Sequence, residues 1–313
     1  MLTRRTVVLV KQEVTYGVDP TPTPADNALE VYDFNIKPLP DKITRKPYKG
    51  TLGASPHVIG KTLFEGSFKL DVRGSGAVYS ASVKPECDAI LQACGFSATL
   101  DSTPSSEKYT YAPVSTAQKS VTIYAYYDGV IYKIRGAFAS VKGNVSAGKI
   151  SSLDFSFKGL YQLPVDGALV SPTLLTVQPP IVENAGLTIG GYAGGIYDAF
   201  EFDAGTAIGE RLNINSPEGL HSLYIHDRDL SASISPLATL EATNAWWTKF
   251  KAGTSQALAI TIGATQYNRM KINAPAVQFG GLDPGDRDGE RTYQIPLSLA
   301  EVSGDDDLEI VFD

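Results

Sequence analysis

The chain has 313 residues and a formal net charge of −7, with 29 Gly and 19 Pro but only 2 Cys. Many short runs of Val, Ile, Tyr and Thr, separated by Gly and Pro, favour strands joined by turns over a helical protein. The acidic balance argues against a protein that grips nucleic acid by neutralising phosphates, which requires clustered Lys and Arg. The length suits two domains of about 150 residues, each large enough to bury a core.

Residues 6–10 are apolar and β-branched and predict a first strand. The run is too short for the apolar core of a signal peptide. No run in the chain approaches the roughly 18 apolar residues of a membrane span. We therefore expect a protein that folds in a cytoplasm.

Residues 16–27 contain Pro20, Pro22 and Pro24, which exclude a helix and a central strand. This segment is expected to be an extended arm or loop. Apolar residues over 29–36 then predict a strand, which Pro38-Leu39-Pro40 is expected to close.

Residues 41–61 show no sustained period and carry several basic side chains, with Asp41 as the only acid. A structureless stretch of this length is unusual inside a compact domain and is commonly either functional or disordered. One interpretation is a mobile surface loop. The other is a protruding arm that docks on an acidic neighbour, which the local charge favours. The arm candidates are Arg45, Lys46, Tyr48, Lys49 and His57.

An amphipathic helix is expected between Pro85, which suits an opening turn, and Gly95, which suits a C-terminal cap. Cys87 and Cys94 lie on this helix, too far apart for a disulfide, and are expected to be buried thiols. Around the helix, alternation predicts strands over residues 64–72 and 153–157, and Asp128-Gly129 predicts a hairpin over 119–134.

The proline punctuation between residues 162 and 180 resembles an interdomain connection, and we place the linker at about 163–171. A second helix is expected over 240–251, ending at Gly253. The strands expected in the second half are 187–189, 200–202, 211–215, 222–234, 258–262, 270–272, 293–299 and 308–312.

The two halves repeat one pattern of helix, strand, turn, strand, glycine-containing loop and strand, over residues 84–161 and 240–300. The equivalent pieces are 120–123 with 258–260, 132–134 with 270–272, Gly143 with Gly281, and 153–157 with 295–299. Two generic β domains could imitate this pattern. We interpret it as duplication and predict a mainly β fold with short flanking helices, with a first domain at 1–165 and a second at 172–313.

No catalytic or cofactor motif is recognisable. The three His lack the spacing of a zinc site, and the glycine-rich segment 190–195 lacks the context of a dinucleotide fingerprint. The acidic stretch 283–290 fails as a calcium loop, because Pro284 and Ile295 fall where carboxylates are needed. We expect neither an enzyme nor a bound metal or cofactor. Two acidic turns remain, with Asp283, Asp286, Asp288, Asp305, Asp306 and Asp307.

Several segments in the first half are distinctive: KQEVTYGVDPTPT at 11–23, ADNAL at 25–29, LGASP at 52–56, ILQACGF at 90–96 and SVTIY at 120–124. In this order they resemble the major tail tube proteins of long-tailed, siphovirus-type bacteriophages. The resemblance covers most of residues 10–165. The second half is similar to that family only in the order of its strands and helix.

The resemblance implies tandem tail-tube domains, each a β-sandwich or incomplete barrel, whose inner sheets join into rings that stack as a hollow tail. Tubes of this family generally present six such domains per ring, so a chain with two would form a trimeric ring with pseudo-sixfold symmetry. The basic arm would then contact the neighbouring ring. The aspartates of the acidic turns would face the lumen or make acidic contacts.

The same resemblance implies a structural protein of the virion, assembled in the cytoplasm of the host bacterium and not in a membrane. DNA would pass through the lumen into the host without specific binding. The implied partners are other copies of the chain and the tail terminator, tape measure and distal tail proteins.

Two other classes fit the β-rich sequence. A two-domain β adhesin or carbohydrate-binding module would use exposed Trp246, Trp247 or Tyr clusters as a ligand platform, but both tryptophans fall on the expected second helix. The tube protein of a contractile injection machine would share the fold. Such proteins usually carry one tube domain, so the duplication disfavours this alternative.

Overall fold

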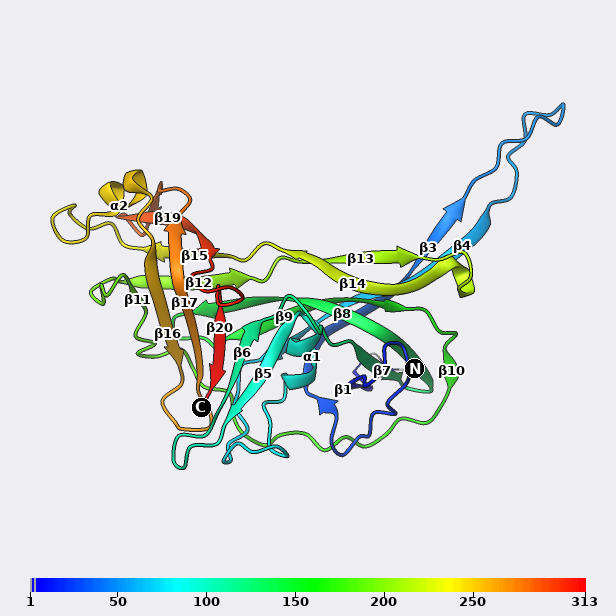
Figure 1. Ribbon diagram of the computed structural model, residues 1–313, viewed down its shortest axis with the longest axis horizontal. Coiled ribbons are helices and arrows are strands. Elements are labelled where there is room, and N and C mark those ends of the chain that lie inside the picture. Colours follow the sequence, from blue (N-terminus) through cyan, green and yellow to red (C-terminus); the bar gives the residue numbers. More distant parts are fainter. Residues whose placement is uncertain (1, 3) are drawn as a thin grey trace.

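The computed structural model describes residues 2 and 4–313. It is mainly β, with the short helices α1 (Asp88–Ala93) and α2 (Trp246–Ala252) beside the strands (Figure 1). The prediction of a mainly β fold with short flanking helices is confirmed.

β8 (Val130–Ser146) belongs to both sheets of the N-terminal half. It changes sheet near Gly136, where φ is +57° and the pairing register shifts, a conformation that suits glycine. Its first part continues the sheet of β7 (Val121–Tyr127), β1 (Thr6–Gln12), β2 (Ala28–Leu29) and β10 (Val165–Asp166). Its last part continues the sheet of β9 (Ser152–Leu160), β4 (Val58–Asp71) and β3 (Val31–Ile43).

Helix α1 covers this half from one side. Ile90 and Leu91 are fully buried, and Gly95 follows the helix with a φ of +88°. This agrees with the expected amphipathic helix and its glycine end. Cys87 and Cys94 are free and buried, as predicted, and burial raises the pKa of both thiols well above its ordinary value.

The C-terminal half repeats the same order of pairings. Helix α2 begins at Trp246, later than the expected residue 240, and Gly253, whose φ of +59° is left-handed, caps its C-terminal end, as the sequence predicts. The first sheet runs through β11 (Thr188–Ile189), β16 (Gln256–Ile262) and the start of β17 (Met270–Phe279). The second runs from the end of β17 through β19 (Glu290–Ala300) and β15 (Ser231–Pro236) to β12 (Tyr197–Asp203), with β18 (Asp283–Arg287) beside β19.

The two halves are joined by backbone pairing and by one core. β12 pairs with the end of β8, and β20 (Glu309–Phe312) lies between β17 and β6 (Lys108–Pro113), which pairs with β5 (Phe96–Asp101). One hydrophobic cluster contains residues of both halves, among them Phe68 and Ile260. The expected domain limits, 1–165 and 172–313 with a linker at 163–171, remain predictions.

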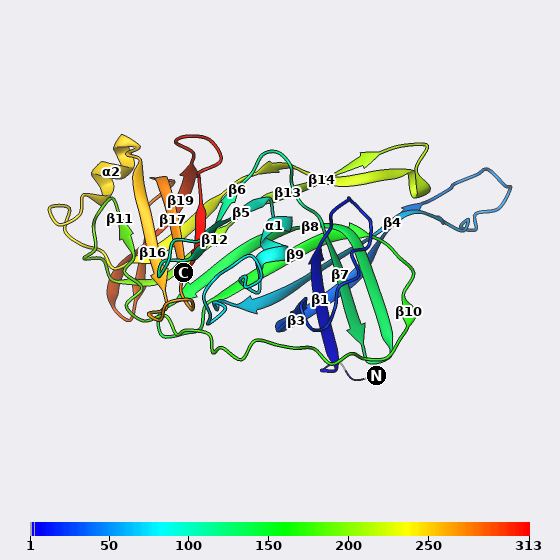
Figure 2. The same ribbon diagram turned by 60° about the horizontal axis from the view of Figure 1, so that its bottom comes forward.

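A long hairpin formed by β3 and β4 projects from the body of the molecule (Figure 1). We call residues 36–65 the arm, with a stem (36–43 and 58–65) and a tip (44–57). A second hairpin, β13 (Thr206–Leu212) and β14 (Leu220–Arg228), with the 3-10 turn Pro217–Gly219 at its end, runs across the N-terminal half. Figure 2 shows the arm projecting on the same side from another direction.

Several strand limits differ from the sequence prediction. β3 continues through Pro38 and Pro40 to Ile43, because it pairs with β4 on one side and an edge strand tolerates proline. The strand expected at 211–215 lies earlier, as β13. The single strand expected at 222–234 is divided into β14 and β15, because the chain leaves the projecting hairpin there and returns to the body.

Candidate assembly surfaces

The arm tip gathers all five arm candidates on one protruding loop. Arg45, Lys46, Tyr48, Lys49 and His57 are exposed, and residues 44–57 contain no acid. The Lys49 ammonium donates a hydrogen bond to the carbonyl oxygen of Ala54 at 3.3 Å. The predicted arm therefore exists as a hairpin with a basic end, shorter in its irregular part than the predicted 41–61.

The β13–β14 hairpin is held against the N-terminal half by charge. Glu210 accepts a hydrogen bond from Lys158 Nζ at 2.7 Å and another from Lys61. Burial alone would raise the pKa of Glu210, but the two lysines outweigh it and lower the pKa below its ordinary value. The Glu210 carboxylate thus connects a strand of one half to two strands of the other.

Apolar contacts accompany this ion pair. A small cluster contains Leu63 and Phe138 from the N-terminal half and Leu220 and Leu223 from β14, with Leu160 packed against it. The backbone N–H of Leu223 also donates to the Tyr16 hydroxyl at 2.7 Å. The hairpin therefore docks through a buried apolar strip beside a charged pair.

The first acidic group lies on a strand and its turn, where a solvated turn was expected. Asp283 and Asp286 are on β18, which pairs with β19, and Asp288 is in the tight turn that follows. Asp288 and Gly289 have φ values of +52° and +87°, which a two-residue hairpin turn requires. All three aspartates are exposed.

The second acidic group is tied to the chain's own residues. Asp305 accepts hydrogen bonds from Arg228 at 2.5 Å and from the Ser115 hydroxyl at 2.6 Å, which hold its pKa below the ordinary value. Asp307 pairs with the same arginine at 3.5 Å. Asp306 accepts the backbone N–H of Val302 at 2.8 Å. The six predicted acids therefore form two separate sets with different environments.

The junction of β8 and β12 was not found from the sequence. Ala199 to Asp203 pair with Ser146 to Lys142, and Lys142 Nζ lies 2.7 Å from the Asp203 carboxylate. At Gly143 the backbone approaches the ring of Phe202 so closely that a Cβ atom would lie 1.9 Å from a ring carbon. The correspondence of Gly143 with Gly281 was the one signal in the sequence that this position is special.

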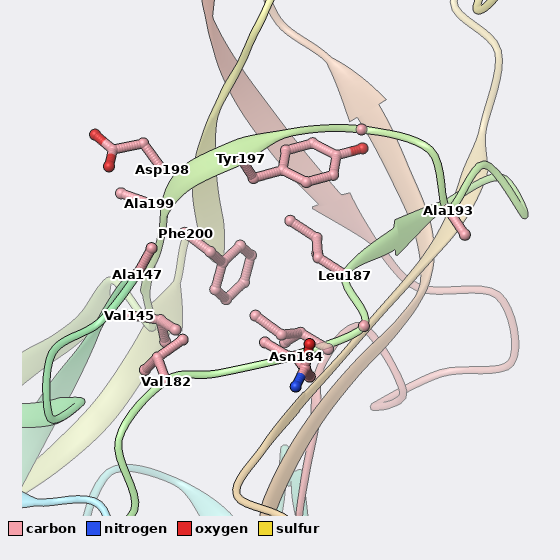
Figure 3. Close-up of a pocket in the computed structure, with 14 residues that line it drawn as sticks. Val145, Ala147, Val182, Asn184, Leu187, Ala193, Tyr197, Asp198, Ala199 and Phe200 are labelled. Carbon is pink, nitrogen blue, oxygen red and sulfur yellow. The ribbon is translucent and has the colours of Figure 1, made fainter.

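A hollow of about 490 Å³ lies beside that junction (Figure 3). Most of the residues that line it are apolar, and Figure 3 shows Leu187 and Phe200 pointing toward each other while the Asp198 carboxylate points away. Such a lining lacks the convergent polar groups of a substrate or cofactor site. Among the described residues, no group of three or more His, Cys, Asp and Glu is placed to hold a metal ion.

The tryptophans do not form an exposed platform. Trp246 is 1% exposed and packs edge-on against Tyr192, whereas Trp247 is 47% exposed and its indole N–H donates to the Tyr293 hydroxyl at 3.3 Å. Of the helices that the structure describes, neither is long and apolar enough to cross a membrane.

Comparison with known protein families gives a match over almost the whole chain. The family model described as phage tail tube protein matches residues 3–311, which includes both halves. A search of curated proteins found no match.

Proposed function

Because the chain belongs to the phage tail tube protein family, with its structural role in the tail, we propose that it assembles into stacked rings around a hollow lumen. The observation that carries this proposal is the sheet β3-β4-β9-β8-β12-β15-β19, which crosses from one half to the other at the β8–β12 junction. Within the described residues, β3 and β18 each pair on one side only. Unpaired edges of this kind are templates for pairing with another chain.

A ring of three chains fits the repeated order of strands. If each half contributes one equivalent sheet, three chains present six, and the β8–β12 junction inside each chain alternates with a similar junction between chains. A heterologous contact of this kind closes into a ring when the rotation from one chain to the next is a whole fraction of a full turn. The ring then has threefold symmetry and pseudo-sixfold sheet packing.

The proposed tube is a conduit through which DNA passes into the host without specific binding. A protein with a net charge of −7 supplies walls that do not attract phosphate. Asp283, Asp286 and Asp288 are the stronger candidates for the lumen wall, because they are exposed while Asp305 and Asp307 pair with Arg228. The role is structural and involves no catalysis, metal or cofactor.

The arm tip is the proposed contact between rings. Its basic residues, with Tyr48 and His57, extend away from the body and suit an acidic surface on the next ring. In a siphovirus-type tail, the tube would also contact the tail terminator, tape measure and distal tail proteins, and would assemble in the host cytoplasm.

Negative-stain microscopy of the purified chain tests the proposal. We expect rings or hollow tubes, with three chains per ring by mass measurement and threefold averages with six similar lobes. A protein that stays monomeric at all concentrations, or that binds glycans as a monomer, would overturn the tube function. Tubes built from rings of six chains would retain the tube function and reject the trimer.

A further inference from the structure

The repeated order of strands assigns an equivalent to each residue of the arm stem. Leu153–Phe157 of β9 correspond to 295–299 of β19 by sequence pattern. Ser67 pairs with Ser156, and Ser231 pairs with Ser298, so Ser67 and Ser231 are equivalent. Asn35 pairs with Ser67, and Asp203 pairs with Ser231, so these two are equivalent as well.

From these equivalent residues onward, the arm stem and the β13–β14 hairpin have the same residue spacing and share equivalent cross-strand pairs. On the first strand of each hairpin, the spacing from Asn35 to Lys42 equals the spacing from Asp203 to Glu210. On the second strand, the spacing from Ile59 to Ser67 equals the spacing from Leu223 to Ser231. The pairing agrees with this, because Lys42 lies opposite Ile59 and Glu210 lies opposite Leu223. The arm stem is therefore the counterpart of the hairpin that docks on the N-terminal half.

The two hairpins differ in what covers them. Leu223 is 2% exposed because it packs on the N-terminal half, whereas its counterpart Ile59 is 50% exposed. Ile43 and Val58, the adjacent pair at the end of the stem, are exposed to a similar degree. The stem thus carries an apolar strip whose equivalent is buried within the chain.

The receiving surface also has an uncovered counterpart. Leu160, which packs against the cluster with Leu223, corresponds to Val302, and Val302 is 66% exposed. Lys158, the partner of Glu210, corresponds to Ala300, next to the exposed Glu301. Lys42 stands where Glu210 stands in the other hairpin, so the hairpin side carries the opposite charge, and on the receiving side an acid, Glu301, lies one residue from the counterpart of Lys158.

We propose that the arm stem of one chain lies across the C-terminal half of a second copy of the chain in the same ring. Ile59 packs against Val302, and Lys42 lies beside Glu301, as Leu223 and Glu210 meet the N-terminal half within one chain. The proposal rests on the ring proposed above and names the surfaces that close it. The tip, which is longer than the end of the β13–β14 hairpin, extends past this contact toward the next ring.

Thiol cross-linking of the full chain tests the placement. The variant Ile59→Cys with Val302→Cys, in assembled tubes treated with a short bismaleimide, is expected to give dimers and closed trimers on a denaturing gel. The native thiols Cys87 and Cys94 are buried and give little background. The control pair, Leu52→Cys with Val302→Cys, uses an exposed residue of the tip and is expected not to link. Tubes in which only the control pair links, or neither, would overturn the inference and leave the tube function standing.

Charge reversal gives a second readout that does not depend on introduced thiols. We expect Lys42→Glu and Glu301→Lys, each alone, to raise the concentration at which rings form about tenfold. The double variant is expected to recover most of this loss. Additive losses in the double variant, with unchanged melting temperature, would reject the contact. Absence of rings from the unaltered chain would instead reject the proposed function itself.

Discussion

Glu210 on β13 and Lys158 on β9 join the two halves of the chain through a hydrogen-bonded ion pair of 2.7 Å. Lys61 on β4 pairs with the same carboxylate, so Glu210 faces two cations. The pair is only partly shielded from water, which limits its strength. Its position nevertheless fixes the β13–β14 hairpin on the surface of the N-terminal half.

Replacing Glu210 with Gln is expected to lower the free energy of unfolding by about 1 kcal/mol, since the variant loses the charge that both lysines face. The folded-state pKa of Glu210 is below its unfolded value, so its stabilising contribution is present above the unfolded pKa. The contribution is lost as the pH falls through the folded pKa. Denaturant unfolding across acidic pH measures the difference. The exposed Glu290→Gln should leave the profile unchanged, and an equal loss in both variants would contradict this assignment.

Glu13 is a buried carboxylate of the N-terminal half that accepts several hydrogen bonds. It is 4% exposed and accepts four hydrogen bonds of 2.6 to 2.7 Å. The donors are the backbone N–H groups of Gly17 and Gly136 and the hydroxyls of Ser120 and Thr122. The group links the end of β1 to β7 and to the bend in β8.

Replacing Glu13 with Gln is expected to cost about 2 to 3 kcal/mol of unfolding free energy, because the amide NH₂ would face donors and leave them unpaired in the interior. Chemical denaturation of the purified chain measures this. The isosteric change Glu183→Gln, at an exposed position, serves as a control for the Glu/Gln exchange itself. A loss below about 0.5 kcal/mol would show that water replaces the missing acceptor.

Local patterns in the sequence predicted the local elements well. Asp128 and Gly129 form the expected hairpin turn with positive φ values, and Gly95 and Gly253 follow the expected helices. These features depend on the residues of one short segment, so the sequence carries them directly.

The features that depend on distant segments were not predictable in the same way. Pro38 and Pro40 mark a strand end in sequence, but an edge position tolerates them, and whether β3 lies at an edge depends on which strands lie beside it in the folded sheet. Glu13 gave no signal because three of its four donors, Ser120, Thr122 and Gly136, lie far along the chain. The arm tip was found because charge without periodicity is visible locally, whereas the exposed strip at Ile59 became meaningful only beside Leu223.

The close approach at Gly143 predicts a steric effect at the junction of the halves. Replacing Gly143 with Ala places a methyl group in the space of the buried Phe202 ring, so either the ring or β12 must move. We expect a loss of about 1 to 3 kcal/mol in unfolding free energy, typical of overpacking. Gly53→Ala, where a Cβ meets nothing and φ is not positive, is the matched control. Equal stability of the two variants would mean that the Phe202 ring or β12 moves aside with no loss of unfolding free energy.

The arm tip predicts a separation between ring formation and tube growth. Reversing Arg45, Lys46 and Lys49 to Glu removes the positive end of the arm while leaving the stem and its pairing intact. We expect rings to persist but long tubes to shorten or disappear in electron micrographs. We also expect added salt to weaken tube growth of the unaltered chain, because salt screens exposed charges.

Lys251→Glu, at the exposed end of α2, changes charge on another surface and should leave tube length unchanged. Long, regular tubes from the triple variant, or from a chain lacking residues 44–58, would reject the tip as the contact between rings. Loss of rings together with tubes in the triple variant would place the tip in the ring itself, since a contact confined to stacking cannot affect the closure of a single ring.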